Sequence, residues 1–487
     1  MDTNSNRKAH SATRRTAIPH FFKAFLQELR GPRGSDVRSL CRQLLSERGE
    51  ASQTALVQQL LNAYERLDDG GRLAFLDMLN QEFGPDEAAI SDAAARYQRT
   101  PGRATLEALS AAMESPRQRL FCRINTAPRG MATLVDMRGQ VVRLTATRPD
   151  LMSLDADLKH LFSLWFNRGF LRLERIGWHT SALILEKLIH YESVHEINGW
   201  PDLRRRLAAD RRCFAFFHPS LPEEPIIFVE VALTKGIAAE LEPLLDVNAP
   251  VLPVEQADTA IFYSISNCLD GLRGISFGNA LIKQVVEDLG AELDGIKSYC
   301  TLSPLPRLAR ALRNCQGEEG FTRQRLARLL ADYAPRLTKV AGDPDPVAAL
   351  WRLLEDPLAH RELLSRPLQR LGLAYLTQLR ANGRPYDPVA AFHFFNGARL
   401  EAVNSFGNLR PAGLKESFGL MANYRYLPNE FEENHERFIQ KGEINVSRRL
   451  APEFKAVAAL WSGSKPGETG GNKVQAHVAE QDGRHAT

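Results

Sequence analysis

Two short segments hold residue types that together could form an acid/base pair. Residues 301–306 read TLSPLP and place the hydroxyl of Ser303 at the end of an apolar stretch, where the following proline restricts the backbone. Residues 392–398 read FHFFNGA and place the imidazole of His393 between aromatic side chains, where burial would shift its pKa. A hydroxyl beside an imidazole is a common unit of acid/base chemistry. Spacing alone is weakly specific, so the surrounding sequence must decide whether these residues act together.

A third segment has the pattern of a phosphate-binding loop. A predicted strand at 260–266 leads into a glycine-rich loop and then into a predicted helix at 280–289. Backbone N–H groups at a helix N-terminus suit a pyrophosphate when glycine leaves them accessible. The candidate phosphate-binding residues are Arg273, Gly274, Ser276, Phe277, Gly278 and Asn279. The loop matches neither the dinucleotide GxGxxG pattern nor a Walker loop, but it resembles the loop with which GCN5-related acetyltransferases hold coenzyme A.

The elements that must position these residues change in type along the chain. From about residue 19 to about 190, apolar residues recur at helical spacing between glycine breaks, which predicts a helical bundle. After about residue 191, short β-branched and aromatic runs at 213–218 and 226–233 predict strands. A further strand is predicted at 296–302, and helical spacing returns from 308 to about 380.

These patterns predict four regions. They are a disordered basic tail at 1–16, a helical bundle at 17–190, a mixed α/β catalytic domain at 191–462 and a disordered tail at 463–487. The first tail is faintly similar to a transit peptide, but a disordered tail is the favoured interpretation. The bundle holds no set of catalytic residue types. It could be a scaffold, an oligomerisation surface or a cover for an active site, and we interpret it as an oligomerisation domain.

Composition limits the possible function classes. The 487 residues are 44% hydrophobic and 25% charged, which is typical of globular proteins. A net charge of +4 is too small to indicate a nucleic-acid-binding protein, although it is compatible with an anionic small molecule. No run approaches the ~18 apolar residues of a membrane span. The six cysteines show no metal-ligand spacing. We therefore expect a cytoplasmic protein without a bound metal, and the absence of a C-terminal Ser-Lys-Leu peroxisomal signal agrees with this.

The short sequence motifs in the second half of the chain, taken in order, closely resemble those of the malonyl-CoA decarboxylase family. The similarity includes HPS at 218–220, VALT at 231–234, AIFYSIS at 260–266, LSPLP at 302–306, PVA at 388–390, FH at 392–393, NGA at 396–398 and GLMANYRY at 419–426. It covers about residues 155–462 and is thinner before them. The resemblance implies an N-terminal helical domain followed by a catalytic domain of acetyltransferase-like α/β fold.

The resemblance also implies an activity. A carboxy-lyase of this family converts malonyl-CoA to acetyl-CoA and CO2 without biotin, pyridoxal phosphate or metal, because the thioester carbonyl accepts the electrons left by CO2. No separate cofactor is expected, since coenzyme A is part of the substrate. We expect a homo-oligomer, a dimer or a tetramer, with no nucleic-acid or membrane partner and a place in fatty-acid and malonate metabolism.

Matching the family's sequence motifs residue by residue places the catalytic serine at Ser303 and the catalytic histidine at His393, with Tyr426 in the same hydrogen-bonding group. Whether the serine or the histidine delivers the final proton stays open. One departure is Ser276, which stands where some relatives have a glutamate in the catalytic hydrogen-bond network. Glu230 is a possible substitute, although nothing in the sequence places it nearby.

Several other residues have weaker functional interpretations. Arg204, Arg205, Arg206, Arg211 and Arg212 form a basic cluster. A solvated helix face is the favoured interpretation of this cluster, with a contact to the 3′-phosphate of coenzyme A as the alternative. For His218 a structural role is favoured. Arg425 is predicted either to pair with the substrate carboxylate or to form a structural ion pair.

Two other function classes remain open at this stage. A coenzyme A-dependent acyltransferase would transfer an acyl group to an acceptor without releasing CO2. A non-catalytic relative would bind coenzyme A and form no product, which Ser276 makes conceivable. The presence of both Ser303 and His393, together with the family's sequence motifs, favours the decarboxylase.

Overall fold

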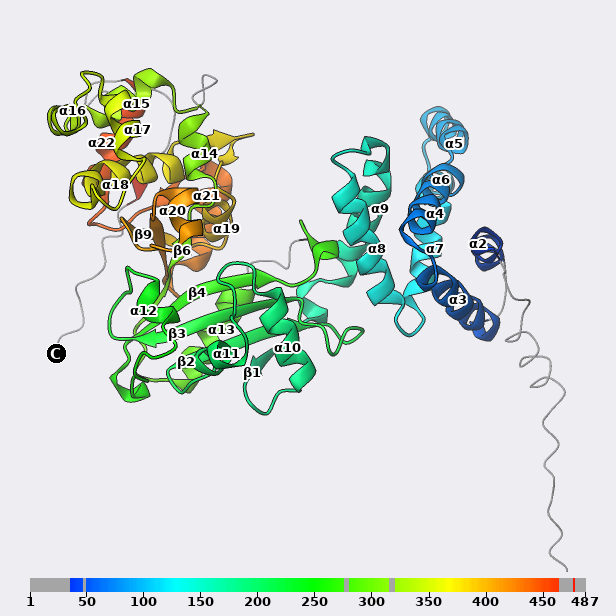
Figure 1. Cartoon of the computed structure of the whole chain (residues 1–487). Helices are drawn as coiled ribbons and strands as arrows, with labels where there is room; N and C mark the ends of the chain where they lie inside the picture. Colours follow the sequence, from blue (N-terminus) through cyan, green and yellow to red (C-terminus); the bar gives the residue numbers. More distant parts are fainter. Residues whose placement is uncertain (1–35, 47–49, 276–279, 315–319, 464–475, 478–487) are drawn as a thin grey trace, which may run out of the picture. The chain divides into compact units, whose positions relative to one another are not determined.

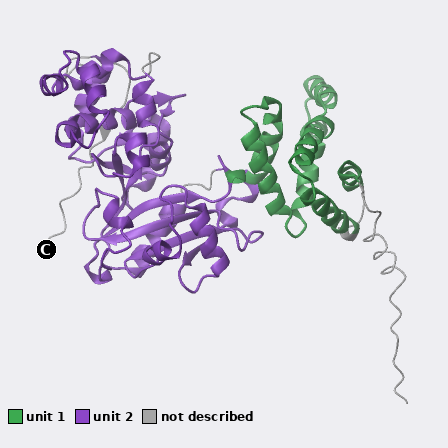
Figure 2. Ribbon diagram, in the orientation of Figure 1, with its two compact units in different colours: residues 1–162, 270–272 green, residues 163–269, 273–487 purple. Residues whose placement is uncertain are grey.

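The protein is described by a computed structural model. The described residues are 36–46, 50–275, 280–314, 320–463 and 476–477. The chain divides into two compact units, coloured separately in Figure 2. Unit 1 comprises residues 1–162 and 270–272, and unit 2 comprises residues 163–269 and 273–487. The predicted tail at 1–16 lies outside the described residues, as does the tail at 463–487 except for residues 463 and 476–477.

Unit 1 is helical. Within its described residues, the helices are α2 (Val37–Leu45), α3 (Glu50–Glu65), α4 (Asp69–Glu82), α5 (Glu87–Arg99), α6 (Arg103–Met113), α7 (Pro116–Asn125), α8 (Gly130–Leu144), the 3-10 turn η1 (Pro149–Leu151) and α9 (Met152–Trp165), which extends three residues into unit 2. Polar caps fix several starts: the carboxylates of Asp68 and Asp86 accept backbone N–H groups at the first turns of α4 and α5. The predicted helical N-terminal region is confirmed.

A short segment of the glycine-rich loop belongs to unit 1. The 3-10 turn η4 (Asp270–Leu272) packs on α8, and Nη1 of the buried Arg138 donates to the carbonyl oxygen of Gly271 at 2.6 Å. A Cβ atom at Gly271 would lie 1.9 Å from the carbonyl oxygen of Val135. Glycine is therefore required here, because the two backbones approach too closely for any side chain.

Unit 2 contains an eight-stranded mixed sheet (Figure 1). In spatial order its strands are β1 (Arg172–Ile176), β2 (Arg211–Phe217), β3 (Ile227–Thr234), β4 (Thr259–Asn267), β5 (Ser298–Thr301), β10 (Met421–Tyr426) and β6 (Ser303–Pro304), with β9 (Arg399–Asn404) also paired to β10. Strands β4 and β5 run parallel, and the other neighbours are antiparallel. The central strands are rich in β-branched and aromatic residues and are buried on both faces.

Unit 2 also contains helices, some of which cover the two faces of this sheet. They are α10 (Ala182–Tyr191), α11 (Trp200–Arg206), α12 (Glu242–Leu245), α13 (Ala280–Glu292), α14 (Leu308–Arg313), α15 (Arg323–Leu330), α16 (Ala334–Ala341), α17 (Pro346–Leu353), α18 (Arg361–Thr377), α19 (Pro388–Phe395), α20 (Pro411–Ser417), α21 (Phe431–Lys441) and α22 (Ala451–Ser462). Val285 and Leu289 of α13 join Phe262 of β4 in one core. Leu185 of α10 and Leu203 of α11 belong to another core, on the opposite face.

The remaining short elements complete unit 2. They are the 3-10 turns η2 (Arg168–Phe170) and η3 (Val254–Gln256), the hairpin of β7 (Arg380–Ala381) and β8 (Arg384–Pro385), and the parallel pair of β11 (Ile444–Asn445) and β12 (Ala476–His477). The fold class predicted from the sequence, an N-terminal helical region followed by a mixed α/β domain, is confirmed.

The structure divides at a different residue from the one predicted. Unit 2 begins at Ser163, whereas the sequence predicted the end of the helical domain at residue 190. Within the intervening segment, β1 pairs with β2 along its whole length. Its sequence, RLERI, buries only Ile176, so it lacks the alternation of apolar and polar residues that would have identified a strand. The segment therefore resembles a continuation of the helical region although it starts the sheet.

Candidate active site

Ser303 lies where two strands of the sheet meet β10. Strand β5 ends at Thr301, and Ser303 begins β6 opposite Ala422 of β10. Side chains two residues apart in an extended chain share a face, and the Oγ of Ser303 donates to Oγ1 of Thr301 at 2.9 Å. Ser303 is only 6% exposed. Its hydroxyl is thus held in a defined direction inside unit 2.

His393 is positioned by the start of its helix. Asp387 caps α19, accepting from the N–H of Ala390 at 2.7 Å, and Pro388 occupies the first helical position. The other carboxylate oxygen of Asp387 accepts from the hydroxyl of Tyr375 at 2.6 Å. Burial raises the pKa of Asp387 to about 6. The cap fixes the start of α19, two turns before its end, and so fixes where His393 points.

Ser303, His393 and Tyr426 form one hydrogen-bonded chain. The Oγ of Ser303 lies 3.0 Å from Nε2 of His393, and the hydroxyl of Tyr426 lies 2.7 Å from Nδ1. The ring of Tyr424 stacks on the imidazole, with centroids 4.3 Å apart and planes inclined by 23°. The structure thus brings together the three residues for which the sequence predicted a catalytic role.

The chain has two self-consistent proton arrangements. If Nε2 carries the imidazole proton, it donates to Ser303, whose own proton points to Thr301, and Nδ1 accepts from Tyr426. If Nδ1 carries the proton, it donates to the oxygen of Tyr426, and Nε2 accepts from Ser303. Since each hydroxyl can donate and accept, a proton can move along the chain by switching between these arrangements.

Burial keeps the chain uncharged. Desolvation lowers the pKa of His393 to about 3, so the imidazole is neutral at neutral pH. Burial also raises the pKa of Tyr426, which keeps the phenol protonated. Among the described residues, no carboxylate contacts the imidazole ring of His393. The site consists of neutral donors and acceptors inside a largely aromatic surround.

The predicted phosphate-binding loop is described only in part. Arg273 and Gly274 are exposed, and Gly274 has a φ of +74°, a conformation that favours glycine. Ser276, Phe277, Gly278 and Asn279 lie outside the described residues. The binding of phosphate by this loop stays a prediction, as does the consequence of having serine at 276.

Glu230 does not take the place of the missing glutamate. Its carboxylate accepts from Nη1 of Arg206 at 2.7 Å, and both side chains are 2% exposed. Strand β3, which carries Glu230, is separated by β4 and β5 from β10, the strand whose tyrosines contact His393. Glu230 belongs to a buried ion-pair network, which also includes Asp202.

The sequence favours a solvated helix face for the basic cluster, and this interpretation is wrong. Arg205, Arg206, Arg211 and Arg212 are all buried. They pair with carboxylates: Arg205 and Arg211 with Asp210, Arg206 with Asp202 and Glu230, and Arg212 with Glu292. The guanidinium of Arg204 lies over the ring of Trp178, 5.5 Å from its centroid. Several of these partners come from distant parts of the sequence, and they make the cluster part of the structural core.

Two other residues have structural contacts. Nδ1 of His218 accepts from the N–H of Ser220 at 3.1 Å, and its ring packs on Phe166, which agrees with the favoured structural role. Arg425 lies on β10 but points away from His393, because Tyr424 and Tyr426 occupy that face of the strand. It lines a cavity on the other side.

The sequence analysis did not identify three residues that contact or position the site. Thr301 bonds Ser303, Tyr424 stacks on His393, and Asp387 caps the helix of His393. Each left a signal: Thr301 and Tyr424 lie two residues from predicted site residues and so share their strand faces. Asp387 followed by Pro388 has the sequence of a helix start.

The described part of the chain offers neither a metal centre nor a membrane span. Within those residues, no group of three or more His, Cys, Asp or Glu side chains is arranged to hold a metal ion. Over the same residues, no helix is both long and apolar enough to cross a membrane.

The fold and the geometry define a class of protein: a mixed α/β domain that buries a neutral serine–histidine–tyrosine chain, preceded by a helical unit. Comparison with known sequences then gives the family. The malonyl-CoA decarboxylase C-terminal domain matches residues 169–462, and the corresponding N-terminal domain matches residues 83–166. The chain belongs to the malonyl-CoA decarboxylase family, as the sequence words indicated, and is an enzyme of the carboxy-lyase class.

Individual relatives agree with this family. The chain is 32% identical over 413 residues to "Malonyl-CoA decarboxylase, mitochondrial" of Anser anser anser, covering 80% of this chain and 82% of the relative. Among solved structures, malonyl-CoA decarboxylase from Rhodopseudomonas palustris matches with a TM-score of 0.76 and 44% identity, and that from Agrobacterium vitis with 0.74 and 43%. These matches cover 86% and 88% of this chain and all of the other chains.

Proposed function

We propose that the protein converts malonyl-CoA to acetyl-CoA and CO2 by way of a thioester enolate. The bond between C2 and the carboxylate breaks, its electron pair moves into the thioester carbonyl, and one proton is then added to C2. Because the thioester accepts the electrons, the proposed reaction needs no separate cofactor. The protein must orient the carboxylate, donate to the developing oxyanion and supply the proton.

The observation that carries this proposal is the 3.0 Å contact between Ser303 and His393 in a member of this family. In the proposed mechanism the hydroxyl of Ser303 bonds the malonyl group. A pre-organised donor to a developing oxyanion is worth ~3–4 kcal/mol, and a positioned acid gives a rate gain of ~10²–10⁴. The proton for C2 travels through the contact between Ser303 and His393.

The neutral state of His393 supports a relay rather than an ion pair. Because the pKa of His393 is lowered to about 3, the imidazole is neutral. It can therefore accept a proton at one ring nitrogen and release a proton from the other. Tyr426 would complete the relay at Nδ1, where its hydroxyl lies 2.7 Å away. Charge would then appear in the site mainly on the substrate, where the reaction needs it.

The proposal has further parts that come from the sequence. The phosphates of coenzyme A are held by Arg273, Gly274, Ser276, Phe277, Gly278 and Asn279. The helical domain predicted at 17–190 mediates self-association into a dimer or a tetramer, and the protein acts in the cytoplasm without metal. These parts are separable from the chemistry, and each can fail without affecting it.

The decisive experiment measures acetyl-CoA and CO2 formed from malonyl-CoA by the full-length protein, with EDTA and avidin present. Ser303→Ala and His393→Ala should lose turnover. Two matched variants serve as controls: Ser298→Ala, in β5, whose Oγ has no hydrogen-bond partner in the described part of the chain, and His160→Ala, an exposed histidine of unit 1. Both controls should keep wild-type turnover.

Other outcomes would point to other functions. Acyl transfer to an amine without CO2 release would contradict the proposal in favour of an acyltransferase. Coenzyme A binding without any product would favour a non-catalytic relative, and Ser276→Glu would then test whether the missing carboxylate is responsible.

A further inference from the structure

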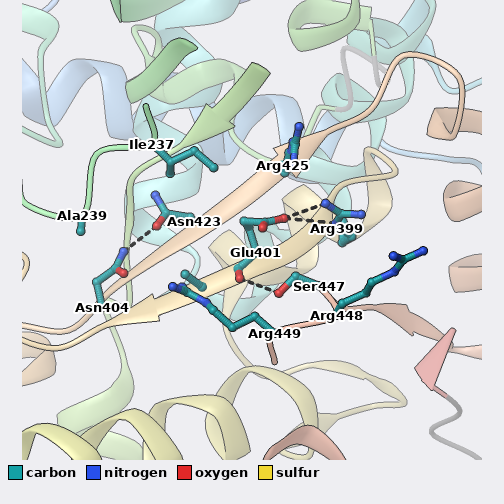
Figure 3. A pocket seen from close by; sticks show the side chains of 11 residues that line it. Ile237, Ala239, Arg399, Glu401, Asn404, Asn423, Arg425, Ser447, Arg448 and Arg449 are labelled. Atoms are coloured by element: carbon teal, nitrogen blue, oxygen red, sulfur yellow. Dashed lines mark hydrogen bonds and ion pairs between the residues drawn. The ribbon is translucent and has the colours of Figure 1, made fainter. Parts of the chain in front are cut away.

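A cavity of about 430 Å³ lies beside β9 and β10 in unit 2 (Figure 3). Its lining is unusually rich in arginine: Arg399, Arg425, Arg448 and Arg449. The volume lies in the range typical of sites for small molecules, ~300–1,000 Å³.

The charges of the lining do not cancel. Glu401 is the single carboxylate among the lining residues, and it already accepts from Nε and Nη2 of Arg399, at 3.2 and 2.9 Å. Figure 3 shows this pair with the other arginines around it. Because Arg399 and Glu401 pair with each other, Arg425 and Arg449 leave the lining with an excess of positive charge.

Two of the remaining arginines carry the argument. The guanidinium of Arg425 lines the cavity and has no hydrogen-bond or ion-pair partner in the part of the chain that the structure describes. It is therefore available to a ligand in the cavity that accepts hydrogen bonds. Arg449 is exposed at the cavity and forms no ion pair with any described carboxylate. Arg448 has other interactions, so nothing here depends on it.

Strand geometry keeps this cavity separate from the candidate active site. Asn423 and Arg425 alternate along β10 with Tyr424 and Tyr426, which contact His393. The cavity residues therefore lie on the opposite face of the strand. In the facing strand β9 the register shifts, because Glu401 is an extra residue between those paired with Asn423 and Tyr424. This β-bulge lets Glu401 and its neighbour both line the cavity.

We propose that this cavity is a second binding site, which takes a small molecule carrying several phosphate or carboxylate groups. Guanidinium groups present fixed forks of N–H donors that match these groups with two parallel hydrogen bonds. The size of the cavity fits a small polyanion. The ligand is a molecule other than the acyl-CoA substrate, because the site faces away from the reacting residues.

The test is calorimetric titration of the full-length protein with inorganic pyrophosphate and with citrate at fixed ionic strength. The wild-type protein should bind at least one of these probes. Arg425→Met keeps the apolar stem but removes the donors, and Arg449→Ala changes an exposed position that should not affect folding. Each substitution should weaken binding about tenfold or more, the usual effect of losing a hydrogen bond to a charged group.

Control variants make the result specific. Arg336→Ala removes an exposed arginine of the same unit outside the cavity and should leave affinity unchanged. His393→Ala should also bind as the wild type does. Failure of the wild-type protein to bind either probe at millimolar concentration would overturn the proposal, as would equal losses in Arg336→Ala and Arg449→Ala.

Competition distinguishes the source of the anion. Pyrophosphate should stay bound when coenzyme A is added at saturating concentration. Its displacement by coenzyme A, abolished in Arg449→Ala, would overturn a separate site and assign these arginines to the phosphates of the substrate.

Discussion

Strand β10 separates a neutral environment from a positively charged one. On one face, Tyr424 and Tyr426 contact a buried, neutral His393. On the other face, Arg425 lines a cavity with three more arginines and one carboxylate. Both faces come from six consecutive residues, since side chains alternate along a strand. Neighbouring residues in sequence can therefore serve entirely different chemistry.

The difference shows what each environment can do. Burial without a charged partner makes a group neutral and allows proton movement without a net charge. Excess charge that is accessible to solvent attracts an anion instead. Asn423 links the two faces, because its Nδ2 donates to the carbonyl oxygen of Thr301 at 2.7 Å, and Thr301 bonds Ser303.

The two faces of β10 should separate in function. Ser303→Ala and His393→Ala should each lower kcat by ~10²–10⁴, and the double variant should be no slower than the worse single one, because the pair acts as a unit. Arg449→Ala, on the other face, should keep the wild-type kcat. Steady-state kinetics of the four variants and the wild type test this, and additive losses in the double variant would contradict the paired action.

A pH experiment tests whether the first face is neutral. Because the pKa of His393 is lowered to about 3 in the folded protein, the unfolded chain binds the extra proton first as the pH falls. The stabilisation by the neutral residue is therefore present above the ordinary histidine pKa of 6.5 and is lost on acidification below it. From pH 7 to pH 5 the wild-type protein should lose about 2 kcal/mol more unfolding free energy than His393→Gln.

Urea unfolding at the two pH values measures this difference. His160→Gln, which changes an exposed histidine, should behave like the wild type. The same pH dependence in the wild type and His393→Gln would mean that the imidazole is not held neutral.

The two tyrosines on the same face of β10 contact His393 in different ways. Tyr426→Phe removes the hydroxyl that bonds Nδ1 of His393 and should lower kcat about tenfold, the value of one hydrogen bond of ordinary strength. Tyr424→Phe keeps the stacked ring and removes a hydroxyl that has no hydrogen-bond partner among the described residues. Its kcat should stay near that of the wild type. Equal losses in both variants would argue against a relay at Nδ1.

The smallest expected effect concerns the cap of α19. Asp387→Ala should destabilise the protein by more than the ~1 kcal/mol of a lost helix cap, because it also leaves the buried hydroxyl of Tyr375 unpaired, and it should lower kcat by displacing His393. Asp345 caps α17 away from the site, so Asp345→Ala should cost only about 1 kcal/mol and should not lower kcat. Thermal unfolding and kinetics of both variants separate positioning from stability. Unchanged kcat in Asp387→Ala would leave the cap a purely structural role.

Much of the fold was predictable because its signals are local. The central strands are runs of β-branched and aromatic residues, and β2, β3 and β4 lie where these runs predicted them. Strand β1 was missed because a largely exposed strand with charged residues has no hydrophobic alternation. The predicted residues Ser303 and His393 came from family words, and their 3.0 Å contact depends on a pairing across 90 residues that no local pattern contains.

The buried ion pairs show the limit of local interpretation most clearly. Arg206 and Arg212 look like surface residues in a run of arginines, since charged residues are seldom buried. Their partners Glu230 and Glu292 lie 24 and 80 residues away. Only the folded sheet brings these charges together, so the sequence alone favours the solvated interpretation.

The position of Gly271 has a practical consequence for anyone who dissects this protein. Residues 270–272 pack with the helical unit, although the chain around them belongs to the sheet unit. A fragment expressed from residue 163 onward would lack Val135 and Arg138, the groups that hold this turn. The loop predicted to bind phosphate begins at the next residue. We expect such a truncated protein to fold its sheet yet bind coenzyme A poorly. Unit 2 should therefore not be studied without unit 1.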